Sequence, residues 1–179
     1  MSSECVSNRY IFVTGGARSC KTSFAIEKAE DISGTRLYLA TAPSDPSDLE
    51  MCSRIERHKA ERAGSWQTIE EPVELAMRLQ GADSPGVILI DCLTLWVSNL
   101  MEGGMEDADI LAAASNLAKT CIASRVPVIT VTNEVGWGIV PENALARRFR
   151  DVAGGVNRLM ASEAAEAYLV ASGLPIRLR

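Results

Sequence analysis

With 179 residues, a hydrophobic fraction of 47% and 23% charged residues, the chain has the length and composition of an ordinary globular protein. Its net charge of -5 excludes a general nucleic-acid-binding protein, because binding to a phosphate backbone requires a basic surface. A nucleotide needs only a local positive site, so this charge is compatible with binding of a small phosphate ligand. The length predicts one domain over residues 1–179.

The apolar runs and the cysteines favour a cytoplasmic protein without a membrane span. Residues 1–8 are polar and lack the apolar core of a signal peptide, and runs such as Val87–Ile90 have only the length of a core strand. The five cysteines are scattered and form no CxxC pair, which is typical of reduced thiols.

Short apolar runs alternate with helical patterns along the chain. The apolar runs predict strands at Tyr10–Val13, Leu37–Thr41, Val87–Ile90, Pro127–Val131 and Ala167–Ala171. The helical patterns cover Lys21–Glu30, Asp48–Glu61, Val73–Leu79, Asp107–Ser124 and Pro141–Ala165, with Pro141 in the first turn of the last helix. The alternation predicts an α/β fold, a mostly parallel sheet with helices on both faces that binds ligands beyond the carboxyl ends of its strands.

The first predicted strand runs into GGARSCKT, Gly15 to Thr22, which fits the P-loop pattern GxxxxGK[ST] except that Cys20 replaces the second glycine. In a P-loop, Lys21 would reach the outer phosphates and the Thr22 hydroxyl could ligate Mg²⁺. Phosphate oxygens would lie against the loop amides, which belong to Gly15, Gly16, Ala17, Arg18, Ser19 and Cys20. The alternative is a glycine-rich turn that only joins a strand to a helix. Cys20 adds weight to that alternative, because its Cβ lies where backbone and phosphate should almost touch, but the P-loop remains the preferred interpretation.

Asp91 ends the apolar run VILID and has two interpretations. An acid at the carboxyl end of a strand could hold the Mg²⁺ shell, as the second acid of a P-loop site does. It could equally cap the helix that follows. The nearby Lys21 and Thr22 favour the metal-binding interpretation.

His58, the only histidine, lies in the cation-rich stretch RIERHKAER. At helical spacing it shares a face with Arg54 and Arg62, so an imidazole flanked by cations could attack an α-phosphate. A solvated charged face is the other interpretation, and a metal site is disfavoured because the chain has no second histidine.

The segment Val131–Ala161 brings further polar residues to the expected ligand edge. Asn133 and Glu134 follow a predicted strand, and Gly136–Trp137–Gly138 is either a mobile flap, an interface, or a plain turn with a buried tryptophan. On the next helix, Arg147 and Asp151 are one turn apart and could pair.

Together these segments closely resemble the bifunctional adenosylcobinamide kinase/adenosylcobinamide-phosphate guanylyltransferase family of cobalamin biosynthesis. The resemblance rests on GGARSCKT, RIERHKAER, WQTIEEP, DCLTLWVSNL and, most specifically, TNEVGWGIVPENALARRFRDVAGGVN, and it extends from about Tyr10 to the C-terminal VASGLPIRL. It implies a RecA-type P-loop NTPase fold and a homotrimer with active sites between subunits.

The resemblance also implies a two-step reaction. A nucleoside triphosphate, ATP or GTP, phosphorylates adenosylcobinamide; GTP then guanylylates a histidine, which passes GMP to the adenosylcobinamide phosphate. The matching positions are His58 for that histidine, Lys21 and Thr22 in the loop, and Asp91 as the strand-end acid. Cys20 stands where the family has glycine, so the alternative is a single-activity or catalytically weakened nucleotide-binding homologue.

Overall fold

A computed structural model describes residues 9–43, 53, 56, 66–82 and 85–179 of the chain. These residues form a seven-stranded sheet in the order β3-β2-β4-β5-β1-β6-β7. The strands are β1 (Tyr10–Gly15), β2 (Arg36–Ala40), β3 (Trp66–Glu70), β4 (Val87–Asp91), β5 (Val128–Asn133), β6 (Glu166–Ala171) and β7 (Leu174–Arg177). The helices are α1 (Lys21–Glu30), α3 (Leu75–Gln80), α4 (Leu93–Glu102), α5 (Asp107–Ala123) and α6 (Ala144–Glu163).

Every neighbouring pair of strands is parallel except β6 and β7, which are antiparallel. The central strands β4, β5 and β1 are nearly continuous apolar runs, as strands covered on both faces must be. Because they run in the same direction, their carboxyl ends meet at one edge, where Asp91, Asn133 and Gly15 end β4, β5 and β1.

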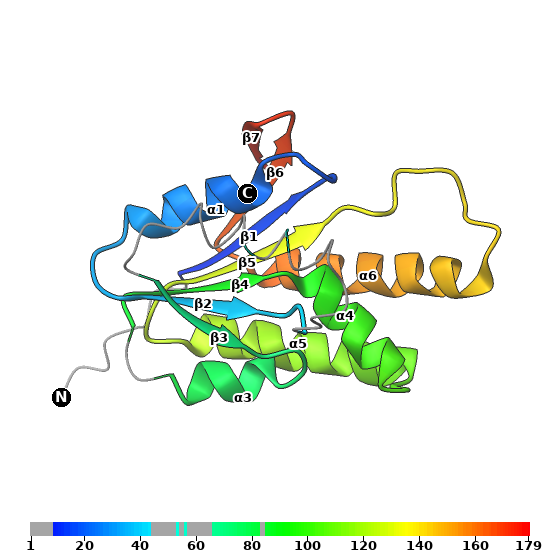
Figure 1. The fold of residues 1–179 in the computed structure, drawn as a ribbon, viewed down its shortest axis with the longest axis horizontal. Coiled ribbons are helices and arrows are strands. Elements are labelled where there is room, and N and C mark those ends of the chain that lie inside the picture. Colours follow the sequence, from blue (N-terminus) through cyan, green and yellow to red (C-terminus); the bar gives the residue numbers. More distant parts are fainter. Residues whose placement is uncertain (1–8, 44–52, 54–55, 57–65, 83–84) are drawn as a thin grey trace.

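Helices cover both faces of this sheet, as the sequence predicts (Figure 1). On one face Ile26 of α1 packs in a cluster with the strand residues Val13, Leu89 and Ile129. On the other face α3, α4, α5 and α6 bury a larger cluster centred on the opposite side chains of the same strands, such as Phe12 and Ile88. The sheet is therefore the middle layer of three, and among the helices with described bounds only α1 covers the first of these faces.

Three elements were not predicted, and the two strands among them have a physical reason. Strand β3 reads WQTIE and is only partly buried at the sheet edge, so it lacks an apolar run. Strand β7 is short, contains Pro175 and is exposed, which is typical of an edge strand. The third is helix α4, which begins two residues after Asp91, where the sequence analysis considered a following helix only in the capping interpretation of Asp91.

Two predicted helix starts are wrong by two or three residues. Helix α6 begins at Ala144 rather than Pro141, because the Asn143 side chain accepts a hydrogen bond from the Ala146 amide at 3.0 Å and caps the helix there. Helix α3 begins at Leu75 rather than Val73. The amides of Val73 and Glu74, which precede the helix, donate hydrogen bonds to the Glu71 carboxylate. The predicted helix Asp48–Glu61 lies outside the described residues except for Ser53 and Glu56, both helical.

No helix within the described residues combines the length and apolar character needed to cross a bilayer.

Candidate functional site

The segment that connects β1 to α1 follows the carboxyl end of β1, as a P-loop does. At Gly15 a Cβ atom would lie 2.4 Å from the Val170 carbonyl oxygen and 2.6 Å from Ser19 Oγ, so no larger residue fits without a shift of the loop. Ser19 Oγ is buried and has no hydrogen-bond partner in the described part of the chain. The chain is therefore closely packed at the position where the P-loop pattern requires its first glycine.

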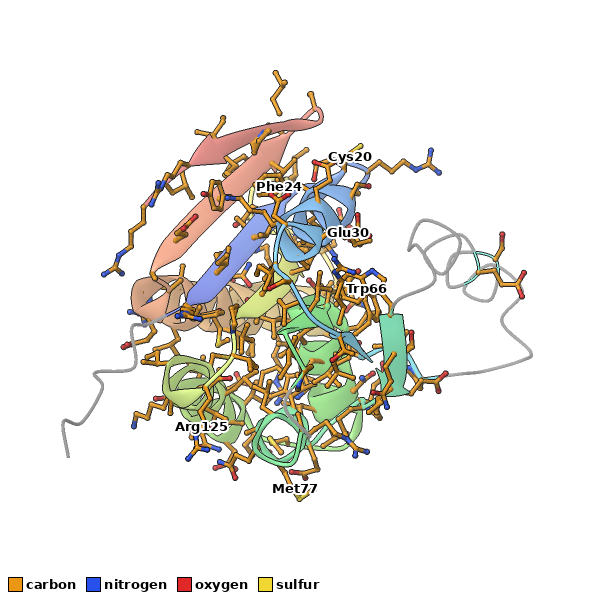
Figure 2. All side chains as sticks on the ribbon, turned by 90° about the vertical axis from the view of Figure 1, so that its left-hand side faces the viewer. Cys20, Phe24, Glu30, Trp66, Met77 and Arg125 are labelled. Atoms are coloured by element: carbon orange, nitrogen blue, oxygen red, sulfur yellow. The ribbon has the colours of Figure 1, made fainter. Side chains whose placement is uncertain are left out.

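Cys20, the departure from the P-loop pattern, adopts a left-handed backbone conformation with φ 66° and ψ 22° at the start of α1 (Figure 2). For a residue with a Cβ this conformation costs about 1–2 kcal/mol, whereas glycine adopts it freely. Arg18 also has a positive φ of 56°. The loop thus keeps the backbone shape that suits glycine although the glycine itself is missing.

Lys21 and Thr22 form the first turn of α1, and both face the loop or the neighbouring strand. The Lys21 ammonium donates a hydrogen bond to the Gly16 carbonyl oxygen at 3.2 Å, so the side chain folds back across the loop. Thr22 Oγ1 donates to Asp91 Oδ2 at 3.1 Å. A cation and a hydroxyl therefore lie at a helix N-terminus, whose free amides favour anions.

Asp91 is bound by two hydroxyl groups from different elements. Its Oδ2 accepts from Thr22 Oγ1 on α1 and from the Tyr38 hydroxyl on β2, at 2.7 Å. The N-cap of α4 is Cys92 and not Asp91, so the capping interpretation of Asp91 is wrong. Sequence reasoning missed Tyr38; the only signal was a polar-tipped residue within the apolar run of β2.

The turn after Asp91 is fixed to the end of β2 by Thr41. Thr41 Oγ1 accepts from the Cys92 amide at 2.7 Å and donates to the Cys92 carbonyl at 2.8 Å, while the Thr41 amide donates to the Asp91 carbonyl. Burial, followed by the neighbouring Asp91 carboxylate, raises the pKa of the Cys92 thiol to about 11. The thiol is therefore neutral, and the backbone around Asp91 is held on both sides.

Asn133 and Glu134 lie beside the loop at the end of β5, as expected from the sequence. Asn133 is the register partner of Gly15, and the Glu134 amide donates to the Gly15 carbonyl at 3.0 Å. Behind them, buried Asn157 on α6 accepts from Thr132 Oγ1 and donates to the Asn133 carbonyl, which fixes the end of β5.

The Gly136–Trp137–Gly138 loop is exposed rather than folded over a core. The Trp137 side chain is 76% exposed and Ile139 is 97% exposed. The interpretation as a turn with a buried tryptophan is therefore wrong, and the flap and interface interpretations remain.

Arg147, Arg148 and Arg150 of α6 each bind a protein group. Arg147 donates to the carbonyls of Pro141 and Glu142, so it anchors the segment before the helix instead of pairing with Asp151, which the sequence left possible. Asp151 pairs with Arg150 at 3.5 Å. Arg148 binds Asp107 of α5.

Of the predicted site residues, the structure brings Gly15, Lys21, Thr22 and Asp91 together at one edge of the sheet. The remaining loop positions, Gly16 to Cys20, lie between them. His58, Arg54 and Arg62 lie outside the described residues.

Comparisons with known proteins agree on one family. The model of the family described as cobinamide kinase / cobinamide phosphate guanyltransferase matches residues 11–178. The chain is 41% identical to the bifunctional adenosylcobalamin biosynthesis protein CobU of Escherichia coli (strain K12), over 94% of this chain and 99% of that protein. It is 36% identical to the corresponding protein CobP of Pseudomonas aeruginosa, over 93% and 95%.

A solved structure supports the fold alone. An ATPase from the type III secretion system of pathogenic bacteria superimposes with a TM-score of 0.56 at 10% sequence identity, over 91% of this chain and 51% of the ATPase chain. The likeness confirms the P-loop type of fold that the sequence predicts.

The left-handed conformation of Cys20 yields a stability prediction. Cys20→Gly should raise the free energy of unfolding by about 1 kcal/mol, because glycine relieves the backbone strain. Cys20→Ala removes the sulfur, keeps the Cβ, and should leave the stability within about 0.5 kcal/mol of the parent. Urea unfolding followed by circular dichroism measures both; equal stabilities for the glycine and alanine variants would contradict the argument.

Proposed function

The chain belongs to the family of bifunctional cobinamide kinases and cobinamide phosphate guanylyltransferases, and on that premise we propose how its own residues carry out the two reactions. The substrates are adenosylcobinamide and its phosphate, together with the nucleoside triphosphates ATP or GTP for the first step and GTP for the second. The observation that carries the proposal is the Thr22–Asp91 hydrogen bond beside Lys21, which joins the helix after the phosphate loop to the carboxyl end of β4.

In the first step the phosphate loop binds the triphosphate. The amides of Gly15 to Cys20 and the N-terminus of α1 hold phosphate oxygens, and Lys21 exchanges its contact with the Gly16 carbonyl for the outer phosphates. The terminal hydroxyl of the aminopropanol arm attacks the γ-phosphorus. The bond to the β–γ bridging oxygen breaks, the nucleoside diphosphate leaves, and the hydroxyl proton is lost to solvent.

The residues around Thr22 fit a magnesium ion. A hydroxyl oxygen and a carboxylate, which are the hard oxygen ligands that Mg²⁺ prefers, lie within hydrogen-bond distance at the loop. Thr22 and Asp91 would hold the ion, directly or through its water shell, and the ion would neutralise charge on the phosphate oxygens.

In the second step His58 carries the GMP group. Its imidazole nitrogen attacks the α-phosphorus of GTP, pyrophosphate leaves, and a phosphoramidate forms. A phosphate oxygen of adenosylcobinamide phosphate then attacks the same phosphorus, which yields adenosylcobinamide-GDP and restores the free imidazole. Arg54 and Arg62, spaced one helical turn to either side in the sequence, would bind the phosphate during both transfers.

The proposed intermediate gives a direct labelling prediction. Incubation with GTP labelled at the α-phosphate and Mg²⁺, followed by denaturation, should leave an acid-labile label on the protein, and His58→Ala should carry none. Lys59→Ala, a neighbour in the same cation-rich stretch, is the control and should be labelled like the parent. Nucleoside diphosphate release from the first step should continue in His58→Ala.

The same labelling experiment on the parent and on Cys20→Gly distinguishes a wrong role for His58 from the alternative of a homologue weakened by Cys20. If neither the parent nor Cys20→Gly is labelled although both are folded, the role of His58 is contradicted. Label that appears only in Cys20→Gly would mean that Cys20 has disabled the loop.

We further propose a homotrimer in which the segment after β5 contacts a neighbouring subunit. Four large apolar side chains are exposed in or just after this segment: Trp137, Ile139, Val140 and Leu145. A group of exposed apolar side chains of this size is typical of a surface that another protein covers. A cytoplasmic location is supported by the free thiols of Cys20, Cys92 and Cys121 among the described residues, and we retain one domain over residues 1–179.

A substitution in this segment tests the trimer. Ile139→Glu introduces a charge at a side chain that is 97% exposed in the single subunit, so it should dissociate the trimer without unfolding the chain. Met77→Glu is the control, because Met77 is also exposed but lies on α3, which is far from the segment after β5 (Figure 1). Light scattering measures the mass; a trimeric Ile139→Glu, or a parent protein that is not trimeric, would contradict the proposal.

A further inference from the structure

The carboxylate of Asp91 receives a hydrogen bond from a residue to which neither reaction assigns a role. Tyr38 donates its hydroxyl to Asp91 Oδ2 at 2.7 Å, shorter than the 3.1 Å bond from Thr22 to the same oxygen. We infer that Tyr38 is a positioning residue, which fixes the Asp91 carboxylate so that a divalent cation and the nucleotide phosphates bind together at the loop. This inference rests on the proposed magnesium site of Thr22 and Asp91.

Tyr38 is held by its surroundings, so its hydroxyl has little freedom. The residue lies in the middle of β2, and its side chain is 4% exposed. It belongs to the cluster under α1, together with Leu89, its register partner on β4. Its ring meets the ring of Trp66 on β3 edge to face, with centroids 6.1 Å apart and an angle of 82° between the planes. The strand pairing and this aromatic contact fix the ring, which in turn fixes the hydroxyl.

The position of the Tyr38 hydroxyl follows from the parallel register. Ala40 is the partner of Asp91, so Tyr38 lies two residues earlier on the adjacent strand and on the same face of the sheet. An aromatic side chain of this length spans the diagonal distance between neighbouring strands. Asp91 is thus held from β2 and from α1 at once, while its backbone is fixed through Thr41.

The chemical consequence concerns Thr22. If the oxygen of the Thr22 hydroxyl faces a cation, its proton must point to an acceptor, and Asp91 Oδ2 is that acceptor. The Tyr38 hydroxyl is a neutral donor, so it orients the carboxylate without cancelling the negative charge that the cation needs. Groups that orient the ligands of a metal are worth about 10- to 100-fold in metal affinity when they are removed.

The test compares GTP binding with and without magnesium by isothermal titration calorimetry. Tyr38→Phe keeps the ring and its contact with Trp66 and removes only the hydroxyl. We expect Mg²⁺ to strengthen GTP binding by the parent, and we expect this gain to fall by about 10-fold in Tyr38→Phe. In excess EDTA the two proteins should bind GTP equally, because the loop amides and Lys21 are unchanged.

Tyr10→Phe is the matched control. The Tyr10 hydroxyl is also buried and hydrogen-bonded, to Thr130 Oγ1 at 2.8 Å, but it lies at the start of β1, at the other end of the sheet from the loop. This variant loses a comparable hydrogen bond and should keep the full magnesium gain. A double-mutant cycle with Asp91→Asn adds a second readout: in that background Tyr38→Phe should cause no further loss.

The outcomes distinguish this inference from the proposal on which it rests. If the parent gains nothing from Mg²⁺, both the magnesium site and the role of Tyr38 are overturned. If the parent gains and Tyr38→Phe gains as much, only the role of Tyr38 is overturned. Equal weakening of Tyr38→Phe with Mg²⁺ and in EDTA, or the same loss in Tyr10→Phe, would mean that the hydroxyl supports the fold alone.

Discussion

The hydrogen bond between Thr22 and Asp91 is the contact on which the rest of the site depends. It joins the first turn of α1 to the end of β4, with 3.1 Å between the Thr22 hydroxyl oxygen and the Asp91 carboxylate oxygen. It gives the helix that begins at Lys21 a direct polar contact with the strand that supplies the acid. The phosphate loop and the acid form one site because α1 lies over the sheet face that carries Asp91.

The parallel sheet supplies the frame for this contact. Strands β1, β5 and β4 end at the same edge of the sheet. The Glu134 amide binds the Gly15 carbonyl and so joins the ends of β5 and β1, and Asn157 of α6 binds both Thr132 and Asn133 at the end of β5. On the other side the Gly173 amide, in the turn between β6 and β7, donates to the Ser19 carbonyl. The loop is therefore held from two neighbouring strands, which helps to explain how it keeps its shape with Cys20 in a left-handed conformation.

The sequence was sufficient to predict the α/β fold, because the central strands are apolar runs separated by helical patterns. It also predicted that Gly15, Lys21, Thr22 and Asp91 would meet, since a P-loop and a strand-end acid share the carboxyl edge of a parallel sheet. Tyr38 could not be predicted, because its role depends on the register of β2 against β4 and on one hydroxyl. Strands β3 and β7 were missed because edge strands need no continuous apolar run. The sequence anticipated that Cys20 would matter, but the main reason, a backbone conformation, is visible only in three dimensions.

The central claim is that a loop with cysteine in place of the second glycine still binds a triphosphate through Lys21. Calorimetric titration of GTP into the parent and into Lys21→Ala tests it most directly. We expect saturable binding by the parent and a dissociation constant at least about 10-fold higher in Lys21→Ala, as the loss of one charge-assisted hydrogen bond requires. Equal dissociation constants, or no saturable binding by a folded parent protein, would contradict it.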